Sequence, residues 1–243
     1  MPFKLRLSLN LRKTVWFKHL FPTLVFAIFM VAIYSKSQWD ITLTNLFFDA
    51  QQHLFPLKRH YFLSQWMHIG LKWLMVTIAL ASLVLSAASY KFSKLKAHRK
   101  SLLWVFVGMV VATATVSILK HYNQHGCPWD LAMYGGDLPL FGLFATQPAG
   151  VEAGRCLPAG HPSGGFALMA FYFAFMHSKP RFANNMLWLG LVMGLLMGMA
   201  QVMRGAHFLS HVLWSGWVVW VVLLILYWIW PPHKAYDFLK QQH

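Results

Sequence analysis

The sequence has 243 residues, of which 58% are hydrophobic and only 11% are charged, whereas an ordinary soluble domain has about 25% charged residues. So few charges exclude a water-soluble enzyme, a disordered chain and a disulfide-dense mini-protein. The formal net charge is +15, but most basic residues lie beside apolar runs, which fits a membrane protein better than a nucleic-acid-binding one. We therefore expect membrane lipids, and no nucleic acid, as partners.

Six apolar segments are candidates to cross a bilayer, for which an α-helix needs about 20 residues. In chain order they are Val15–Ser35, His68–Ser89, Leu102–Ile118, Phe166–His177, Met186–Met203 and Val212–Trp230. The fourth is short, and it either extends past Lys179 or begins near Pro162. None of the long runs alternates between apolar and polar residues as a membrane β-barrel requires. The sequence thus predicts an all-α integral membrane bundle of six transmembrane helices, in a single domain over residues 1–243.

The connections between these spans differ in charge. The larger basic clusters lie in the arm of residues 1–14, in the second-to-third connection, in the fourth-to-fifth connection and in the tail of residues 231–243. Five of the six acidic residues lie instead in the first and third connections: Asp40, Asp49, Asp130, Asp137 and Glu152. Because positive charge is retained inside, we expect both termini in the cytoplasm and the first, third and fifth connections outside.

The outer connections contain two further features. The connection of residues 121–158 is long, has no obvious secondary structure and carries both cysteines. Loops of this length are usually functional. The first outer connection, Trp39–Pro56, has apolar residues near helical spacing, which predicts an interfacial helix.

Ionisable side chains gather at the outer ends of the spans. Lys120 ends the third span, His161 precedes the fourth, and Arg204, His207 and His211 lie between the fifth and the sixth. In the predicted topology these three places share one face of the membrane. Ionisable residues near membrane spans are functional candidates by default, so this face carries the candidate site.

These residue types suit phosphoryl transfer. Lysine and arginine neutralise phosphate oxygens, and Gly160 permits close approach of the backbone to a ligand. Pro162 suits the first turn of a helix, whose free N–H groups bind anions. Two histidines can act as nucleophile and general acid. A third, four residues beyond the nucleophile, lies on the same helical face and can orient its ring.

Three short patterns follow one another in the second half of the chain. They are Lys120, six residues, then Cys127-Pro128; next Pro158-Ala159-Gly160-His161; and last Ala200-Gln201, five residues, His207, three residues, His211. The patterns resemble the motifs of the membrane branch of the type 2 phosphatidic acid phosphatase superfamily, in a divergent bacterial subgroup. Those motifs read Lys, six residues, Arg-Pro; Pro-Ser-Gly-His; and Ser-Arg, five residues, His, three residues, Asp. The resemblance covers about residues 120–214.

The resemblance implies catalytic roles for three histidines. His207 stands at the nucleophile that forms a phosphohistidine, and His161 stands at the general acid that protonates the leaving oxygen. His211 stands where the family has the aspartate that orients the nucleophile.

The expected phosphate-binding residues are Lys120, Arg204, Gly160, Ser163 and Gln201. Cys127 and Gln201 replace the two motif arginines, so either Arg204, on nearly the same helical face as Gln201, or Arg155 from the long loop takes their place. Ser163 either donates to phosphate or has a role in the first turn of its helix.

The resemblance implies a metal-independent lipid phosphatase, without a cofactor, at the periplasmic face of a bacterial inner membrane. Lipid A, undecaprenyl pyrophosphate and phosphatidylglycerol phosphate are candidate substrates. Two alternatives stay open: a phosphotransferase that passes the phosphate to a second lipid, and a metal-binding membrane protein. In the second alternative, His207 and His211, with His121 and His125 at the same spacing, would ligate zinc or copper. The sequence does not define an oligomeric state.

Cys127 and Cys156 both lie outside the membrane in the predicted topology. In an oxidising compartment they either form a disulfide or remain two buried thiols. A bridge between them would tie the first motif to the segment just before His161.

Overall fold

The computed structural model describes residues 3–145 and 149–232, and the ordered elements of this part are helical. The long helices are α1 (Phe3–Ala32), α3 (Leu71–Ala88), α4 (Arg99–His121), α7 (Pro180–Met203) and α8 (Leu209–Ile229), and a π-helix, η2 (Phe62–Gly70), leads directly into α3. The short helices are η1 (Tyr34–Lys36), α2 (Trp39–Asn45), η3 (Ser93–His98), η4 (Pro128–Asp130), η5 (Ala132–Tyr134), α5 (Gly160–Phe166), η6 (Ala167–Met169) and α6 (Ala170–Phe175). The predicted all-α class is confirmed, and α2 lies within the connection where an interfacial helix was expected.

Five of the helical segments are long and apolar enough to cross a membrane: Thr14–Lys36, Phe62–Ala88, Ser93–His121, Pro180–Met203 and Leu209–Ile229. They coincide with five of the six predicted spans, so the chain is a multi-pass membrane protein. Residues 3–14 of the predicted basic arm are helical and continuous with the first span, because α1 begins at Phe3. Most of the predicted tail, residues 233–243, lies outside the described residues.

The fourth predicted span differs from the other five. Its helical part begins at Gly160, as one of the two alternatives anticipated, and ends at Phe175 instead of His177. It consists of α5, the single 3-10 turn η6 and α6, and none of these pieces alone is long enough to span a bilayer. Most of its side chains are buried, so the segment contacts protein where a conventional span would face lipid.

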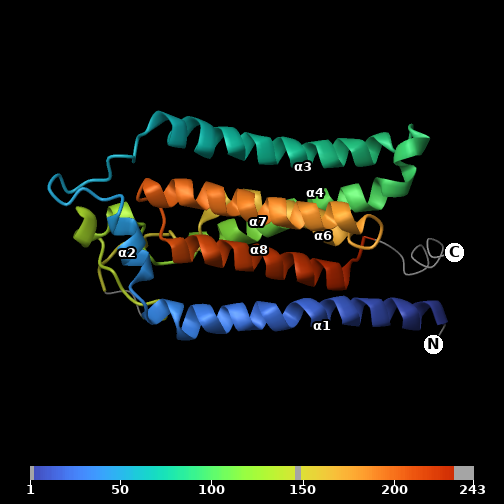
Figure 1. The fold of residues 1–243 in the computed structure, drawn as a ribbon, viewed down its shortest axis with the longest axis horizontal. Coiled ribbons are helices and arrows are strands. Elements are labelled where there is room, and N and C mark those ends of the chain that lie inside the picture. The colour runs from blue at the N-terminus through green and yellow to red at the C-terminus, as the bar shows by residue number, and fades with distance from the viewer. Residues whose placement is uncertain (1–2, 146–148, 233–243) are drawn as a thin grey trace.

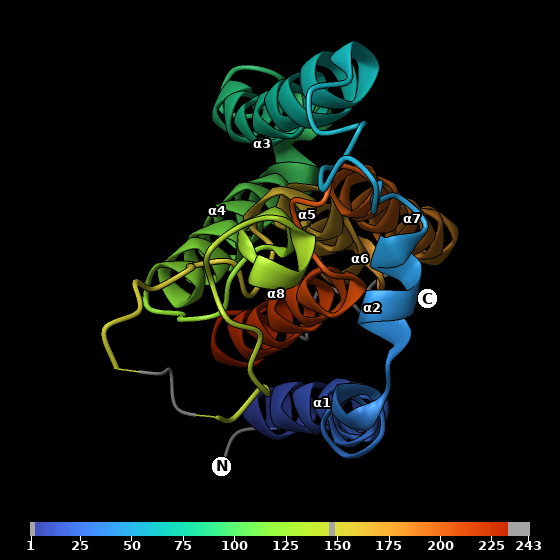
Figure 2. The ribbon, with the colours of Figure 1, turned by 90° about the vertical axis from the view of Figure 1, so that its left-hand side faces the viewer.

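Figure 1 shows the long helices side by side, with α1 beginning and α8 ending at one end of the bundle. The opposite end carries α2 and the connection of residues 122–159, and we call it the loop end. In the view from that end, α4, α5, α6, α7 and α8 form the centre (Figure 2). The helix α1 packs against α8 on one flank, and α3 packs against α4 on the other.

Glycines let the buried segment approach α7 closely. A Cβ atom added to Gly165 on α5 would lie 2.6 Å from the backbone nitrogen of Gly194 on α7, and one added to Gly194 would overlap the ring of Phe166. Small residues are the usual solution where helices pack in a membrane. The contact fixes α5 against α7 and thereby positions the first turn of α5, which carries His161.

A small second core holds the loop end together. It consists of Phe55, Leu131, Tyr134 and Phe208. Beside it, a carboxylate oxygen of Asp40 accepts hydrogen bonds from the Ser210 backbone N–H and from the Tyr34 hydroxyl, both at 2.9 Å. Asp40 thus satisfies a free N–H in the first turn of α8, where a negative charge is also favourable. This anchors the turn that follows His207.

Candidate active site

Residues from three parts of the chain meet at the loop end. Lys120 lies in the last turn of α4, His161 in the first turn of α5, and His207 in the short connection between α7 and α8. A Cβ atom added to Gly160 would lie 4.0 Å from the Lys120 Nζ atom. The Lys120 ammonium group therefore lies beside the first residue of α5.

Backbone hydrogen bonds tie these segments to one another. The Ala159 N–H donates to the His211 carbonyl at 3.0 Å, which joins the start of α5 to α8. The Trp129 N–H donates to the Gly205 carbonyl at 2.9 Å, which joins the long connection to the segment before His207. Gly205 has a φ of +72° and lies against the Phe55 ring. Another residue would be strained there and would also collide with that ring.

A disulfide joins Cys127 to Cys156, and it lies against the nucleophile candidate. The Cys156 sulfur is 3.1 Å from Nδ1 of His207. A disulfide sulfur has no hydrogen, so Nδ1 is the donor in this contact and its proton is held there. That leaves the lone pair on Nε2, which makes Nε2 the ring nitrogen available as a nucleophile.

His211 was expected to orient His207, and its ring lies against the His207 ring. The two imidazole rings meet edge to face with centroids 5.8 Å apart, and the neighbour of His207 Nδ1 is sulfur. His211 Nδ1 is buried without a hydrogen-bond partner among the described residues. His211 thus contacts His207 through ring packing, and the disulfide sulfur contacts the Nδ1 atom of His207.

His161 is held by a residue from the helix that precedes α3. Its Nε2 lies 3.1 Å from the Met67 carbonyl oxygen and donates to it, because a carbonyl can only accept. The His161 ring packs on that of His68, with centroids 4.1 Å apart. The Nδ1 atom is therefore the ring nitrogen left for proton transfer.

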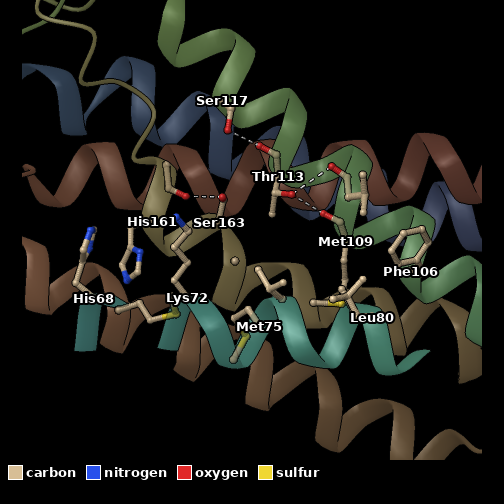
Figure 3. Close-up of a pocket in the computed structure, with 16 residues that line it drawn as sticks. His68, Lys72, Met75, Leu80, Phe106, Met109, Thr113, Ser117, His161 and Ser163 are labelled. Carbon is tan, nitrogen blue, oxygen red and sulfur yellow. Dashed lines mark hydrogen bonds between the residues drawn. The ribbon is translucent and has the colours of Figure 1, made fainter. Parts of the chain in front are cut away.

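A cavity of about 450 Å³ opens beside His161. Its polar end is lined by His68, Lys72, Gly160, His161 and Ser163, and its apolar part by side chains of α3, α4 and α7 that include Met75, Leu80, Phe106 and Met109. Figure 3 shows His68, Lys72, His161 and Ser163 at one end and mostly apolar side chains, with Thr113 and Ser117 of α4 among them, extending away between α3 and α4. A ligand with a charged head and an apolar tail matches this division.

The remaining predicted phosphate ligands lie near the site or outside it. The Arg204 guanidinium donates to the Gln201 Oε1 atom at 3.1 Å and to the Lys58 carbonyl at 3.0 Å. The Gln201 side-chain nitrogen is buried without a partner among the described residues. Ser163 is buried and its hydroxyl donates to the Gly160 carbonyl, which is a first-turn role. Arg155 is exposed, whereas Arg204 is hydrogen-bonded to Gln201 of the third motif.

Burial and positive charge keep the candidate histidines neutral. Burial lowers the pKa of His207 well below its ordinary value of 6.5, and the neighbouring His211, Lys120, His161 and His68 act in the same direction. Burial also lowers the pKa of His161, to about 4, against the opposing effect of its bond to Met67, and the nearby His68, Arg204 and Lys72 lower it further. Both imidazoles are therefore uncharged at neutral pH before an anion binds.

Among the described residues, the four histidines of the metal-binding alternative do not bring three ligand atoms close enough together to hold a metal ion. His121 is exposed and packs on the Tyr122 ring, whereas His211 is buried. Within the described ranges, a single set of three metal-type ligand atoms lies close together: those of Cys127, Cys156 and His207. The disulfide engages both of these sulfurs, so they are not thiolate ligands in this state.

His68 and Lys72 line the cavity but belong to none of the three motifs. Two sequence features could have indicated them. Lys72 is a charge inside an apolar span, and such charges are usually functional. The spacing of four residues also places His68 on the same helical face.

The central segments of this bundle match a known family. A model of the PAP2 superfamily matches residues 101–235, more than half of the chain. The chain therefore belongs to the PAP2 superfamily, and this membership indicates phosphatase activity on lipid-like substrates. Comparisons with curated proteins and with solved structures give no match.

The disulfide carries a prediction of its own. In a Cys127→Ser/Cys156→Ser variant we expect phosphatase turnover to fall by about ten- to a hundredfold, because small displacements of reacting groups have effects of this size. The free energy of unfolding should fall by about 2–4 kcal/mol. Turnover measured well below the unfolding temperature separates the two effects. A variant that retains full turnover would show that the sulfur contact at His207 is dispensable.

Proposed function

We propose that this protein is a metal-independent lipid phosphatase that works through a phosphohistidine on His207. The observation that carries the proposal is that Lys120 and His161 both lie close enough to act on His207 at the loop end, where His161 also lines the polar end of a mostly apolar cavity. A phosphate head group would lie among these side chains, and its hydrocarbon part would extend between α3 and α4.

The proposed reaction has two steps. His207 Nε2 attacks the phosphorus atom, the bond from phosphorus to the leaving oxygen breaks, and His161 transfers a proton to that oxygen. In the second step His161 takes a proton from water, the water oxygen attacks phosphorus, and the N–P bond breaks to release inorganic phosphate. Lys120 and Arg204 balance the charge that develops on the phosphoryl oxygens.

Binding of the phosphate would prepare His161 for the first step. The pKa of His161 is about 4 without a ligand, so the ring must gain a proton before it can act as an acid. A phosphate dianion nearby favours the charged imidazolium and raises this pKa. Substrate binding and protonation of the acid are therefore coupled.

The charge of the site supports metal-independent chemistry. Lys120, Lys72 and Arg204 all act on the candidate histidines, and three cations repel a divalent metal ion. The phosphotransferase alternative uses the same first step, with a lipid hydroxyl or phosphate in place of water in the second. No particular contact in the site favours it over hydrolysis.

We also propose six crossings, with both termini in the cytoplasm of a bacterial inner membrane and the loop end in the periplasm. The segment α5–η6–α6 would be the sixth crossing, because α4 ends at the loop end and α7 begins at the opposite end (Figure 1). The acidic residues of the outer connections support this orientation. Reporter fusions after Lys96 and between residues 150 and 154 test it, and a periplasmic signal after Lys96 would reverse it.

Phosphate release from a panel of lipids in detergent tests the function. Lipid A, undecaprenyl pyrophosphate and phosphatidylglycerol phosphate are the substrates we propose, and EDTA should leave the rate unchanged. Loss of activity in EDTA, with recovery on addition of zinc, would contradict the metal-independent mechanism. Transfer of the phosphate to a second lipid without release would identify the phosphotransferase.

A further inference from the structure

The cavity contains a lysine that the family motifs do not include. Lys72 lies in the first turn of α3, within the candidate membrane span Phe62–Ala88. Figure 3 shows its side chain extending from α3 toward His161 and Ser163. In the described part of the chain, its ammonium group forms no hydrogen bond or ion pair. A charged side chain within a membrane span costs free energy, and such residues usually have a function.

The motif positions of this chain supply fewer positive charges to a bound phosphate than the family pattern does. The family pattern has one lysine and two arginines, and here Cys127 and the neutral Gln201 stand at the arginine positions. The Arg204 guanidinium already donates hydrogen bonds to two protein oxygens, the Lys58 carbonyl and Gln201 Oε1. A phosphate monoester carries a charge of about −1.5 to −2 near pH 7, and a buried anion needs compensating cations.

The segment before Lys72 already forms one wall of the candidate site. Met67 accepts the hydrogen bond from His161, and the His68 ring packs on the same imidazole. Both residues belong to the π-helix η2, and π-turns occur frequently at functional sites. Lys72 lies four residues after His68 and thus on the same face. The face that holds the general acid therefore also carries the lysine.

We propose that Lys72 binds the substrate phosphate directly and supplies, from α3, a positive charge that the motifs of this chain have lost. The phosphate would lie between Lys72 and Lys120, with His161 beside the leaving oxygen. The inference rests on the proposed function, since it concerns the same site. It extends that site to a helix outside residues 101–235, which the family model matches.

Binding of inorganic phosphate to the full-length protein in detergent, measured by titration calorimetry, tests the inference without requiring turnover. Lys72→Met keeps the apolar stem and removes the charge, and we expect phosphate affinity to fall by about ten- to a hundredfold. Lys72→Arg should retain most of the affinity. Lys36 is an exposed lysine at the loop end that lines none of the described cavities, so Lys36→Met is the matched control and should bind as the parent protein does.

Unchanged affinity in a Lys72→Met protein that unfolds at the parent's temperature would overturn the inference, whatever the activity. An equal loss in Lys36→Met would also overturn it, because the effect would then be one of net charge. The same holds if the parent protein binds no phosphate. If the parent binds phosphate but hydrolyses no lipid, the proposed function fails, whereas the role of Lys72 in binding is still decided by these variants.

Discussion

Replacement of His207 by alanine should abolish turnover, with a loss of at least about a thousandfold in kcat. The reason is that, in the proposed mechanism, the substitution removes the atom that forms the covalent bond to phosphorus, and removal of a nucleophile has effects of this size or larger. The side chain is buried and packs against the disulfide and His211, so the variant also leaves a cavity. Phosphate release from the best lipid of the panel is the measurement.

Two controls distinguish chemistry from folding in the His207→Ala experiment. Binding of inorganic phosphate should persist, because the cations of the site remain. His60→Ala changes an exposed histidine that precedes η2 and should leave kcat unchanged. A His207→Ala protein that turns over at the parent rate would remove His207 from the mechanism.

His161→Ala should lower kcat by about a hundredfold to ten-thousandfold for a lipid phosphate, which is the usual contribution of a general acid. The loss should be much smaller for an aryl phosphate with a good leaving group, because such a group departs without a proton. An equal loss for both substrates would assign His161 to phosphate binding and contradict its role as the acid. The comparison requires the same buffer and detergent for both substrates.

The pH dependence of kcat is a second test of the role of His161. The pKa of His161 is lowered to about 4 in the free protein, so the protonated form is lost as the pH rises through that value, and a bound dianion moves this loss to higher pH. For a lipid phosphate, kcat should therefore fall on the alkaline side. The same limb should be absent from His161→Ala and from the aryl phosphate reaction of the parent protein. If the alkaline fall in kcat persists in His161→Ala and in the aryl phosphate reaction, it reports the titration of a group other than His161.

Most of the fold could be predicted from the sequence, because apolar length is a strong signal. Five spans follow from runs of apolar residues that coincide with helices long enough to cross a membrane. The segment of residues 160–175 was harder to define, since a buried segment built from short helical pieces lacks the length and the uniform hydropathy of a lipid-facing helix. Its close packing against α7, at Gly165 and Gly194, is not revealed by periodicity.

The candidate site was predicted less completely, because tertiary contacts determine which groups meet. The motif positions correctly suggested that Lys120, His161 and His207 lie near one another, and the pairing of Cys127 with Cys156 was one of two alternatives. The contact of the disulfide with His207 could not be predicted, since it depends on how the long loop folds back. The same applies to His68, which is far from His161 in sequence and meets it only through helix packing.

The most direct test of the account is detection of the phosphohistidine itself. Brief reaction with a substrate labelled at the phosphoryl group, followed by an alkaline quench, should leave label on the protein that is stable in alkali and lost in acid, as expected for a phosphorus–nitrogen bond. Peptide mapping should place the label on His207, and the His207→Ala protein should carry none. Continued turnover without any labelled protein, or label mapped to another residue, would contradict nucleophilic catalysis by His207.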